Sequence, residues 1–257
     1  MQGLPFSKAF SLEGETALIT GGGTGLGRAI AHAFVEAGAR VILSGRRPEP
    51  LETACRELGP SASYAIYDVA QTTEACSFIS GLRERFGRIS ILVNNAGNHF
   101  KKDAMETGEQ EFRHLMDTHV TGAWALSKAV APCMIEAGRG SILFTASMAS
   151  LFGLPRVFAY TTAKSAIIGM VRSLAVDLSP KGIRVNAIAP GFIETDISRR
   201  ALAGDPERKA RILGRNPMGR LGTPDEIGWS AVFLCSPAAS YINGVILPID
   251  GGILIGF

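Results

Sequence analysis

The stretch TGGGTGLG, residues 20–27, decides the fold class because of what stands on either side of it. An apolar run ends at Thr20, and the segment RAIAHAFVEAG that follows Gly27 has the period of a helix. Glycines in such a turn let backbone N–H groups approach a phosphate, and the helix presents the positive end of its dipole to the same group. We therefore predict a dinucleotide-binding turn. Its phosphate contacts are expected from Gly21, Gly23, Thr24, Gly25, Leu26 and Gly27.

Outward from this turn, short aliphatic or β-branched runs alternate with longer segments of helical period. This alternation is typical of βα units that feed a parallel sheet buried on both faces. The expected strands are residues 17–20, 40–44, 63–67, 89–94, 141–146, 184–189 and 245–249. We expect a single domain over residues 1–257. The Arg-rich stretch at about 194–217 is either a helical lid beside a ligand site or a surface helix pair.

Composition excludes several classes of protein. The 257 residues are 46% hydrophobic and 19% charged, which is too apolar for a disordered chain and enough for one sizeable core. A net charge of +3 without a basic cluster argues against nucleic-acid binding, and the sequence has no apolar run long enough for a membrane span. No secretory leader is evident, so we expect a cytoplasmic protein. The four scattered cysteines are expected as buried thiols, with neither disulfide nor metal site: Cys55, Cys76, Cys133 and Cys235.

The end of the second expected strand bears on the choice of nicotinamide cofactor. About 20 residues after the glycine turn, a carboxylate typically binds the ribose 2′-OH of NAD. The sequence there is Ser44-Gly45-Arg46-Arg47, with two arginines and no carboxylate. A guanidinium can hold the 2′-phosphate of NADP by two charge-assisted hydrogen bonds, and the alternative is a pair of solvated surface arginines. We predict a preference for NADP(H) over NAD(H).

Tyr160 and Lys164 form a candidate acid–base pair. Their spacing places the phenol and the ammonium one turn apart on one helical face, although many such pairs are ordinary surface residues. An ammonium about 4 to 5 Å from the phenol favours phenolate by about 3 to 4 kcal/mol at an effective dielectric near 20. That would bring the pKa of the tyrosine toward neutrality. Ser147 follows the strand at 141–146, where its hydroxyl binds a substrate oxygen or caps the next turn.

In order and spacing, these motifs resemble the short-chain dehydrogenase/reductase family over nearly the whole chain. The resemblance rests on TGGGTGLG at 20–27, NNAG at 94–97, Ser147, Tyr160 with Lys164, RVNAIAPG at 184–191 and DGG at 250–252. It implies a doubly wound sheet of the Rossmann type with helices on both faces, a nicotinamide cofactor, and hydride transfer between a carbonyl and an alcohol. It also implies that Tyr160 is the general acid/base, Ser147 polarises the substrate oxygen, and Lys164 holds the nicotinamide ribose and lowers the pKa of Tyr160.

The resemblance assigns further cofactor contacts by position. Asp68 and Val69 match positions beside the adenine. The positions beside the ribose are Asn95, Ala96 and Gly97, and those around the nicotinamide amide and the pyrophosphate are Pro190, Gly191, Ile193 and Thr195. The family also implies a homotetramer, for which the amphipathic segments 110–136 and 158–179 and the C-terminal GGILIGF offer apolar surface.

Position 119 departs from the family pattern. His119 stands where the family usually has an asparagine, which helps to hold a water in the proton relay behind the lysine. An imidazole also donates and accepts hydrogen bonds, so it would hold the same water and add a group that titrates near pH 6.5. The alternative is a weakened relay with lower turnover. His119 is therefore included among the candidate catalytic residues.

The substrate is less constrained than the reaction. Basic residues in the expected lid, with His99, Lys101 and Lys102 after NNAG, favour an acidic small molecule, although they also suit a solvated face or a subunit contact. The preferred hypothesis is a keto-sugar acid or polyol, as in gluconate 5-dehydrogenases, with His99, Phe192 and Ser147 at the substrate. Other readings are a 3-oxoacyl-carrier-protein reductase, a cofactor-binding regulator with weak turnover, and an epimerase. A more apolar ketone would be favoured if the pocket is lined by Phe100, Phe152, Phe158 and Phe192.

Overall fold

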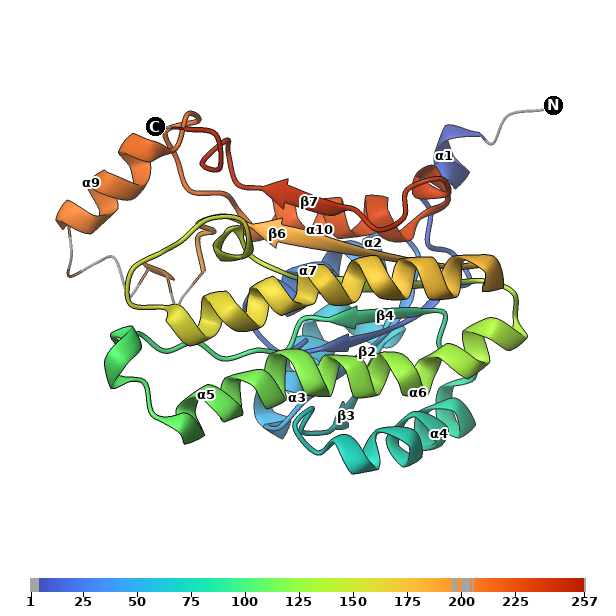
Figure 1. Ribbon diagram of the computed structural model, residues 1–257. Coiled ribbons are helices and arrows are strands. Elements are labelled where there is room, and N and C mark those ends of the chain that lie inside the picture. Colours follow the sequence, from blue (N-terminus) through green and yellow to red (C-terminus); the bar gives the residue numbers. More distant parts are fainter. Residues whose placement is uncertain (1–4, 196–197, 200–203, 205, 257) are drawn as a thin grey trace.

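The strands of the chain form one parallel sheet (Figure 1). The structure is a computed structural model that describes residues 5–195, 198–199, 204 and 206–256. Within this part, seven strands lie in the order β3-β2-β1-β4-β5-β6-β7, and every neighbouring pair is parallel. The strands are β1 (Thr16–Thr20), β2 (Arg40–Gly45), β3 (Ala62–Ile66), β4 (Ile91–Asn94), β5 (Gly140–Thr145), β6 (Ile183–Pro190) and β7 (Ile246–Ile249). The predicted doubly wound seven-stranded sheet is confirmed, with strand ends within two residues of expectation.

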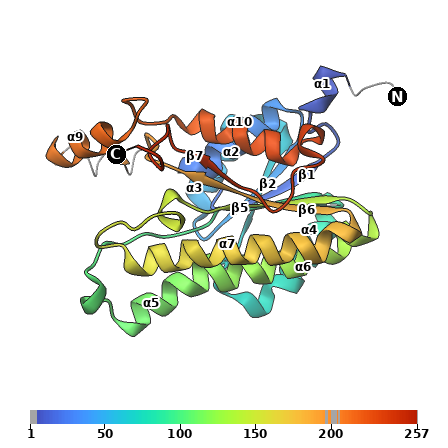
Figure 2. The same ribbon diagram turned by 45° about the horizontal axis from the view of Figure 1, so that its top comes forward.

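Helices cover both faces of this sheet (Figure 2). One face carries α4 (Ala75–Phe86), α6 (Gly122–Glu136) and α7 (Phe158–Leu178), and the other carries α2 (Gly25–Glu36), α3 (Pro48–Leu58) and α10 (Pro224–Cys235). Successive strand residues point to opposite faces, so Leu18 joins the first of two apolar cores and Ile19 the second. Burial on both faces explains why the strands read as continuous apolar runs.

The remaining elements lie mostly at the ends of the layers. Short helices are α1 (Phe6–Ala9), α5 (Glu109–Met116) and α9 (Pro206–Arg215). Single helical turns occupy Gly59–Ser61, Thr72–Glu74, Ala104–Glu106, Met148–Ser150, Ser179–Lys181 and Pro237–Ala239. The expected helix at 110–136 is α5 and α6 joined by a π-helical turn, Asp117–Thr121. In the expected lid at 194–217, α9 is described, whereas residues 196–197, 200–203 and 205 lie outside the described residues.

The strand order defines where a ligand can bind. β1 lies between β2 and β4. From β1 the chain continues to β2 and β3 on one side, and the later strands, β4 to β7, follow on the other side of β1. At such a switch point the loops leaving the carboxyl ends of the strands diverge and leave a crevice. The loops that carry the glycine turn, Arg46, NNAG and Ser147 all follow carboxyl ends of strands, so they meet at one edge of the sheet.

Two further expectations concern membranes and thiols. No helix in the described part of the chain is both long and apolar enough to cross a bilayer. All four cysteines are free thiols; Cys133 and Cys235 are buried, Cys55 is half-buried and Cys76 is exposed. The expectation that all four are buried is therefore wrong for Cys76, which lies on the outer face of α4.

Candidate active site

The glycine turn holds its shape through close backbone contacts. Gly21 has a φ of +66°, in the left-handed region that favours glycine, and its N–H donates to the Ser44 carbonyl at 2.7 Å. A Cβ at Gly27 would overlap the Gly21 carbonyl oxygen, so the first turn of α2 sits directly against the loop. The N–H groups at the start of α2 therefore point toward the crevice at the carboxyl end of β1.

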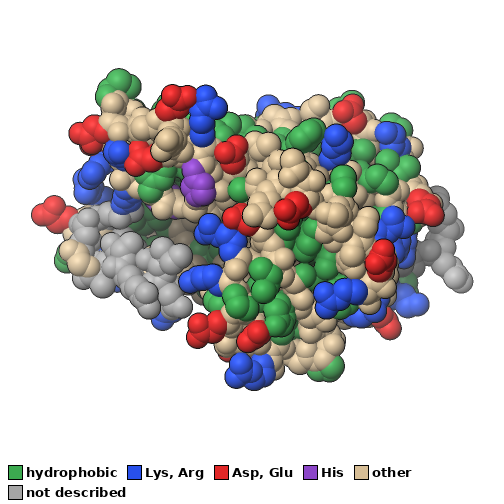
Figure 3. All heavy atoms as spheres, turned by 90° about the horizontal axis from the view of Figure 1, so that it is seen from below, with side chains coloured by type: hydrophobic (Ala, Val, Ile, Leu, Met, Phe, Trp, Pro, Cys, Tyr) green, Lys and Arg blue, Asp and Glu red, His purple; other side chains and the backbone are tan. Residues whose placement is uncertain are grey.

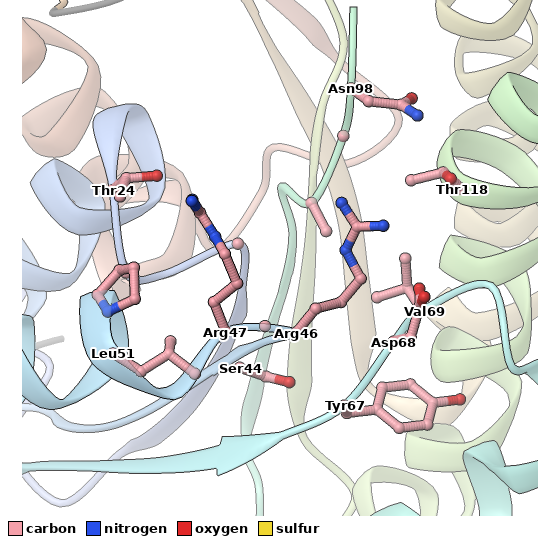
Figure 4. Close-up of a pocket in the computed structure, with 16 residues that line it drawn as sticks. Thr24, Ser44, Arg46, Arg47, Leu51, Tyr67, Asp68, Val69, Asn98 and Thr118 are labelled. Carbon is pink, nitrogen blue, oxygen red and sulfur yellow. The ribbon is translucent and has the colours of Figure 1, made fainter.

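A cavity of about 170 Å³ opens in front of this turn (Figure 4). Its lining brings together residues from the loops after β1, β2, β3 and β4. Of the expected cofactor contacts, the lining includes Gly21, Gly23, Thr24, Arg46, Arg47, Asp68, Val69, Ala96 and Gly97. The lining residues that the sequence did not predict are Ser44, Gly45, Pro50, Leu51, Tyr67, Asn98 and Thr118. A dinucleotide fits this donor set because backbone N–H groups lie at one end of the cavity and guanidinium groups along its side.

Both arginines after β2 extend along the cavity. In Figure 4 the Arg47 guanidinium lies on the side of Thr24, and the Arg46 guanidinium lies on the side of Asp68 and Val69. Both side chains are exposed, so they can turn toward a bound anion. The two cations therefore line the cavity beside the glycine turn, where they can attract an anionic group of a ligand.

Thr20 fastens the NNAG loop to the glycine turn, a role that the sequence analysis did not assign. Its hydroxyl accepts hydrogen bonds from the N–H groups of Asn95 and Ala96, both at 3.0 Å. The Asn95 amide in turn donates to the Thr20 carbonyl at 3.0 Å and accepts from the Thr145 hydroxyl at 3.3 Å. Asn95 thus links the carboxyl ends of β1, β4 and β5 by hydrogen bonds. Thr20 is the first residue of the TGGGTGLG motif, so the sequence contained the residue that makes these hydrogen bonds.

Ser147, Tyr160 and Lys164 meet beside this loop. Ser147 is buried and its hydroxyl accepts from the Ala149 N–H at 3.1 Å, so it caps the following turn as one reading expected. Lys164 is 3% exposed, donates from Nζ to the Thr145 carbonyl at 2.6 Å, and has Nζ 5.7 Å from the centre of the Tyr160 ring. The side chains of α7 and the end of β5 thus place a phenol between a hydroxyl and an amine.

The electrostatics of this trio differ from the expectation. Burial raises the pKa of the Tyr160 phenol, and a hydrogen bond with Ser147 partly offsets the rise. Burial also lowers the pKa of Lys164 to about 7, so that side chain is only partly charged at neutral pH. The expectation that Lys164 lowers the phenol pKa toward neutrality is therefore wrong for the ligand-free chain. Loss of water around the phenol raises its pKa, and this effect is larger than the attraction between the phenolate and Lys164, because the amine is only partly charged.

His119 lies in the π-helical turn, with its ring edge-on to Tyr160 at a centroid distance of 5.6 Å. Its Nε2 lies 2.8 Å from the Asn98 carbonyl oxygen and 3.2 Å from the Asn98 backbone nitrogen. We assign the proton to Nε2 on the shorter of these contacts, which leaves Nδ1 as an acceptor. Burial, with a contribution from the nearby Lys164, lowers the pKa of His119 to about 3. The expected titration near pH 6.5 is therefore wrong, and the imidazole is neutral at physiological pH. Gly97 is required here, because a Cβ would overlap the imidazole Cε1.

A small cavity of about 10 Å³ lies behind the trio and is lined by His119, Lys164, Thr20 and Asn94 among others. The His119 Nδ1 and the Asn94 Oδ1 are both buried without a hydrogen-bond partner within the described structure. A water needs about this much room and two to four polar partners. The cavity therefore has the size and the lining of a single-water site.

The other expected site residues lie at the same sheet edge but farther apart. The His99 ring contacts Tyr160 at a centroid distance of 4.7 Å. Pro190 ends β6, and Gly191, Ile193 and Thr195 follow it. Phe192 lines a separate hollow of about 700 Å³ with Trp229 and Asp250. In the part of the chain that the structure describes, no cluster of His, Cys, Asp or Glu could hold a metal ion.

A larger hollow lies at the opposite edge of the sheet, and the hydrogen bonds of its Arg184 are structural. It measures about 1000 Å³ and includes Arg184. The Arg184 guanidinium donates to the carbonyls of Leu234, Cys235 and Ser236 at 2.6 to 3.2 Å, so it caps the end of α10. The acid–base groups and the glycine turn are both at the carboxyl edge instead.

Comparisons with known proteins match nearly the whole chain. A family model described as "Enoyl-(Acyl carrier protein) reductase" matches residues 21–254. The chain is 40% identical over 250 residues to the 2-dehydro-3-deoxy-D-gluconate 5-dehydrogenase of Pseudoalteromonas atlantica, covering 95% of this chain and 97% of that one. It is 35% identical over 242 residues to a 3-oxoacyl-[acyl-carrier-protein] reductase of Vibrio cholerae, covering 94% and 98%. A gluconate 5-dehydrogenase from Burkholderia cenocepacia, crystallised in complex with NADP and tartrate, matches with a TM-score of 0.93 at 33% identity, covering 98% and 99%.

Proposed function

Because the chain belongs to the short-chain dehydrogenase/reductase family, we propose a particular reaction for it: NADPH-dependent reduction of the keto group of a sugar acid or polyol, and its reversal. The enzyme is an oxidoreductase that interconverts C=O and CH–OH groups. The observation that carries the proposal is the meeting of Tyr160, Ser147 and Lys164 at the sheet edge that also holds the cavity in front of the glycine turn.

The trio has distinct roles in the reduction. Bound NADPH supplies a hydride to the carbonyl carbon. Tyr160, whose raised pKa keeps the phenol protonated at neutral pH, donates its proton to the carbonyl oxygen. The Ser147 hydroxyl donates a hydrogen bond to the same oxygen and polarises it. Lys164 holds the nicotinamide ribose and stabilises the phenolate left behind. In the reverse direction a raised phenol pKa favours oxidation at higher pH.

His119 belongs to the relay that returns a proton to Tyr160. A water in the small cavity would donate to the buried His119 Nδ1 or Asn94 Oδ1 and accept from Lys164 Nζ. A neutral imidazole suits this place, because it offers one donor and one acceptor without adding charge beside Lys164. This reading supports a retained relay over a weakened one.

Arg46 and Arg47 hold the 2′-phosphate of NADP, and the glycine turn holds the pyrophosphate. The absence of a carboxylate at the end of β2 removes the group that would favour NAD. Asp68 and Val69 flank the adenine, and Asn95, Ala96 and Gly97 line the ribose side. Near the nicotinamide lie Pro190, Gly191, Ile193 and Thr195.

We propose an acidic or polyhydroxylated substrate for two reasons: the side chains around the site and the substrates named for relatives of the chain. Two of the relatives act on gluconate or its dehydro-deoxy derivative. Figure 3 shows a histidine and several Lys and Arg side chains beside a hollow, with Asp and Glu side chains among them. His99, which touches Tyr160, is the proposed side-chain contact of the substrate beside Ser147. Phe192, the third residue expected at the substrate, lines a separate hollow with Trp229 and Asp250.

The second candidate is reduction of a 3-oxoacyl group on an acyl carrier, favoured by the relative from Vibrio cholerae. A non-catalytic regulator is disfavoured by the intact trio. We further propose that the protein is cytoplasmic, where its free thiols would stay reduced, and that it forms a homotetramer. Exposed Trp124 and Val176, on α6 and α7, and Ile255 in the C-terminal segment supply apolar surface for sister subunits, which light scattering would test.

The decisive experiment is a screen for NADPH oxidation with keto-sugar acids, ketoses and acetoacetyl thioesters, in the wild type and in Tyr160→Phe. We expect stoichiometric oxidation with a keto-sugar acid and a loss of about 10²- to 10⁴-fold in the variant. Activity with thioesters alone would replace the proposed substrate by the second candidate. No oxidation with any of the three sets would favour the regulator, and substrate conversion without NADPH consumption would favour the epimerase.

A further inference from the structure

Arg215, the last residue of α9, is held in place by two contacts. The guanidinium carbon lies 4.4 Å from the centre of the Phe152 ring, and Nε donates to the Ile253 carbonyl at 3.4 Å. The first contact uses the flat face of the guanidinium, and the second uses only one of its five N–H groups. The side chain is therefore oriented, while most of its hydrogen-bonding capacity is unused.

No described aspartate or glutamate pairs with Arg215, and no described carbonyl accepts from its terminal nitrogens, Nη1 and Nη2. By contrast, Arg220, five residues on, is occupied by a two-pronged contact with Glu226. A stacked guanidinium keeps its outer edge open, and two parallel N–H groups on that edge match the two oxygens of a carboxylate. Arg215 thus has the geometry to bind an anion, and no carboxylate of the described residues occupies its outer edge.

The contact with Phe152 ties Arg215 to the catalytic loop. Phe152 stands five residues after Ser147 and is joined to it by tight turns, in which Ser150 N–H donates to the Ser147 carbonyl and Phe152 N–H to the Met148 carbonyl. Ser147 and Phe152 therefore belong to the same short loop after β5. Figure 1 shows α9 beyond the carboxyl ends of the strands, with the loop between β5 and α7 lying between α9 and α5.

A carboxylate bound at the far end of this loop requires a keto acid whose two functional groups are several carbons apart. Four C–C bonds between a carbonyl carbon and a carboxyl carbon cover about 5 Å in extended form. A hydrogen bond to the guanidinium adds about 3 Å. In extended form the carboxylate of such an acid, with its hydrogen bond, reaches about 8 Å from the reacting carbonyl carbon, several ångströms farther than that of a 2-keto acid.

We propose that Arg215 is the specificity-determining residue that binds the substrate carboxylate, with Phe152 as the positioning residue that holds the guanidinium flat. The inference rests on the proposed function, because it assigns the acidic end of a keto-sugar acid to a named side chain. It adds that the carboxylate lies about four carbons from the reacting carbonyl.

The test compares kcat/KM for two substrates of equal length, 5-ketogluconate and the ketohexose in which CH₂OH replaces the carboxylate. The variants are Arg215→Gln and, as the matched control, Arg211→Gln, which removes an equal charge from an exposed position four residues earlier on α9. Arg215→Gln should lower kcat/KM for the keto acid by about 10- to 100-fold through KM, with ketohexose activity within about twofold of wild type. Arg215→Lys should recover part of the loss, and Arg211→Gln should change neither substrate.

Three results would overturn the inference. Wild-type preference for the keto acid that persists in Arg215→Gln would exclude Arg215 as the receptor and leave the proposed function standing. An equal fall for both substrates would show that Arg215 only fastens α9 to the catalytic loop. If the wild type itself does not prefer the keto acid over the ketohexose, the acidic substrate class fails, and the assignment of Arg215 fails with it.

Discussion

Replacing Lys164 by methionine should stabilise the ligand-free protein by an amount that depends on pH. Lys164 is 3% exposed, and the structure gives its Nζ one hydrogen bond, to the Thr145 carbonyl. Burial lowers its pKa from 10.5 to about 7. The unfolded chain therefore binds more protons than the folded chain between these values. The free energy of unfolding gains from rising pH across this window, and the cost of burying the amine is complete below about pH 7.

The magnitude follows from the shift. With 1.36 kcal/mol for each pKa unit, the cost of the buried lysine is about 4 kcal/mol at pH 7 and about 2 kcal/mol at pH 9. Methionine has a similar length and no charge, so it removes this cost and also one hydrogen bond worth about 1 kcal/mol at either pH. The gain in stability from Lys164→Met should thus be about 2 kcal/mol larger at pH 7 than at pH 9.

Urea unfolding of both proteins at the two pH values measures this difference, because groups common to both proteins cancel. Lys128→Met is the matched control, since Lys128 is exposed on α6 and its replacement should shift stability equally at both pH values. A gain from Lys164→Met that is the same at pH 7 and pH 9 would refute the reasoning. It would mean that Lys164 keeps its ordinary pKa in the folded chain, with water reaching the amine.

Three further predictions concern the cofactor and the relay. Arg46→Asp should lower the ratio of kcat/KM for NADPH to that for NADH by about 100-fold or more, because a charge-assisted contact becomes a repulsion, and an unchanged ratio would contradict the role of Arg46. Gly97→Ala should lower kcat/KM by about 10-fold, since the new Cβ overlaps the His119 ring. Adding His119→Asn should recover part of that loss, whereas additive losses would show that the two residues are independent. The pH–rate profile should lack an acid limb from His119 between about pH 5 and 8, because its pKa is about 3, and a limb that disappears in His119→Asn would show the imidazole titrating there.

The sheet could be predicted closely because its signal is local. Apolar runs bounded by glycine or polar turns placed every strand within two residues of its observed ends. The long helical pattern at 110–136 was also recovered, except for the π-helical turn Asp117–Thr121 inside it. One extra residue in a turn leaves no trace in hydrophobic periodicity, although His119 lies in that turn with its ring edge-on to Tyr160. Motif order also brought together the lining of the cofactor cavity, whose parts come from separate loops.

The charges of the site could not be predicted in the same way, because pKa depends on burial as well as on neighbours. Spacing alone gave an attraction between Lys164 and the Tyr160 phenolate. Burial in the fold opposes this attraction, because both side chains lose water and each favours its neutral form. The pKa of Tyr160 therefore rises and that of Lys164 falls. The prediction that Cys76 is buried was wrong for a related reason. Cysteine is usually a buried residue type, but the position of Cys76 on α4 leaves it exposed.

Burial also explains how a histidine can stand where the family usually has an asparagine. In water an imidazole differs from an amide because it gains a proton near pH 6.5. Inside this site desolvation and Lys164 remove that difference, and the neutral ring is left with one N–H donor and one nitrogen acceptor. In the tautomer assigned from the shorter contact, Nε2 donates to the Asn98 carbonyl and Nδ1 accepts. Those are the hydrogen-bonding functions of a side-chain amide. The larger ring needs more room, and the missing Cβ at Gly97 provides it. The exchange is therefore conservative in the folded chain, although the sequence alone would score it as the introduction of a titratable group.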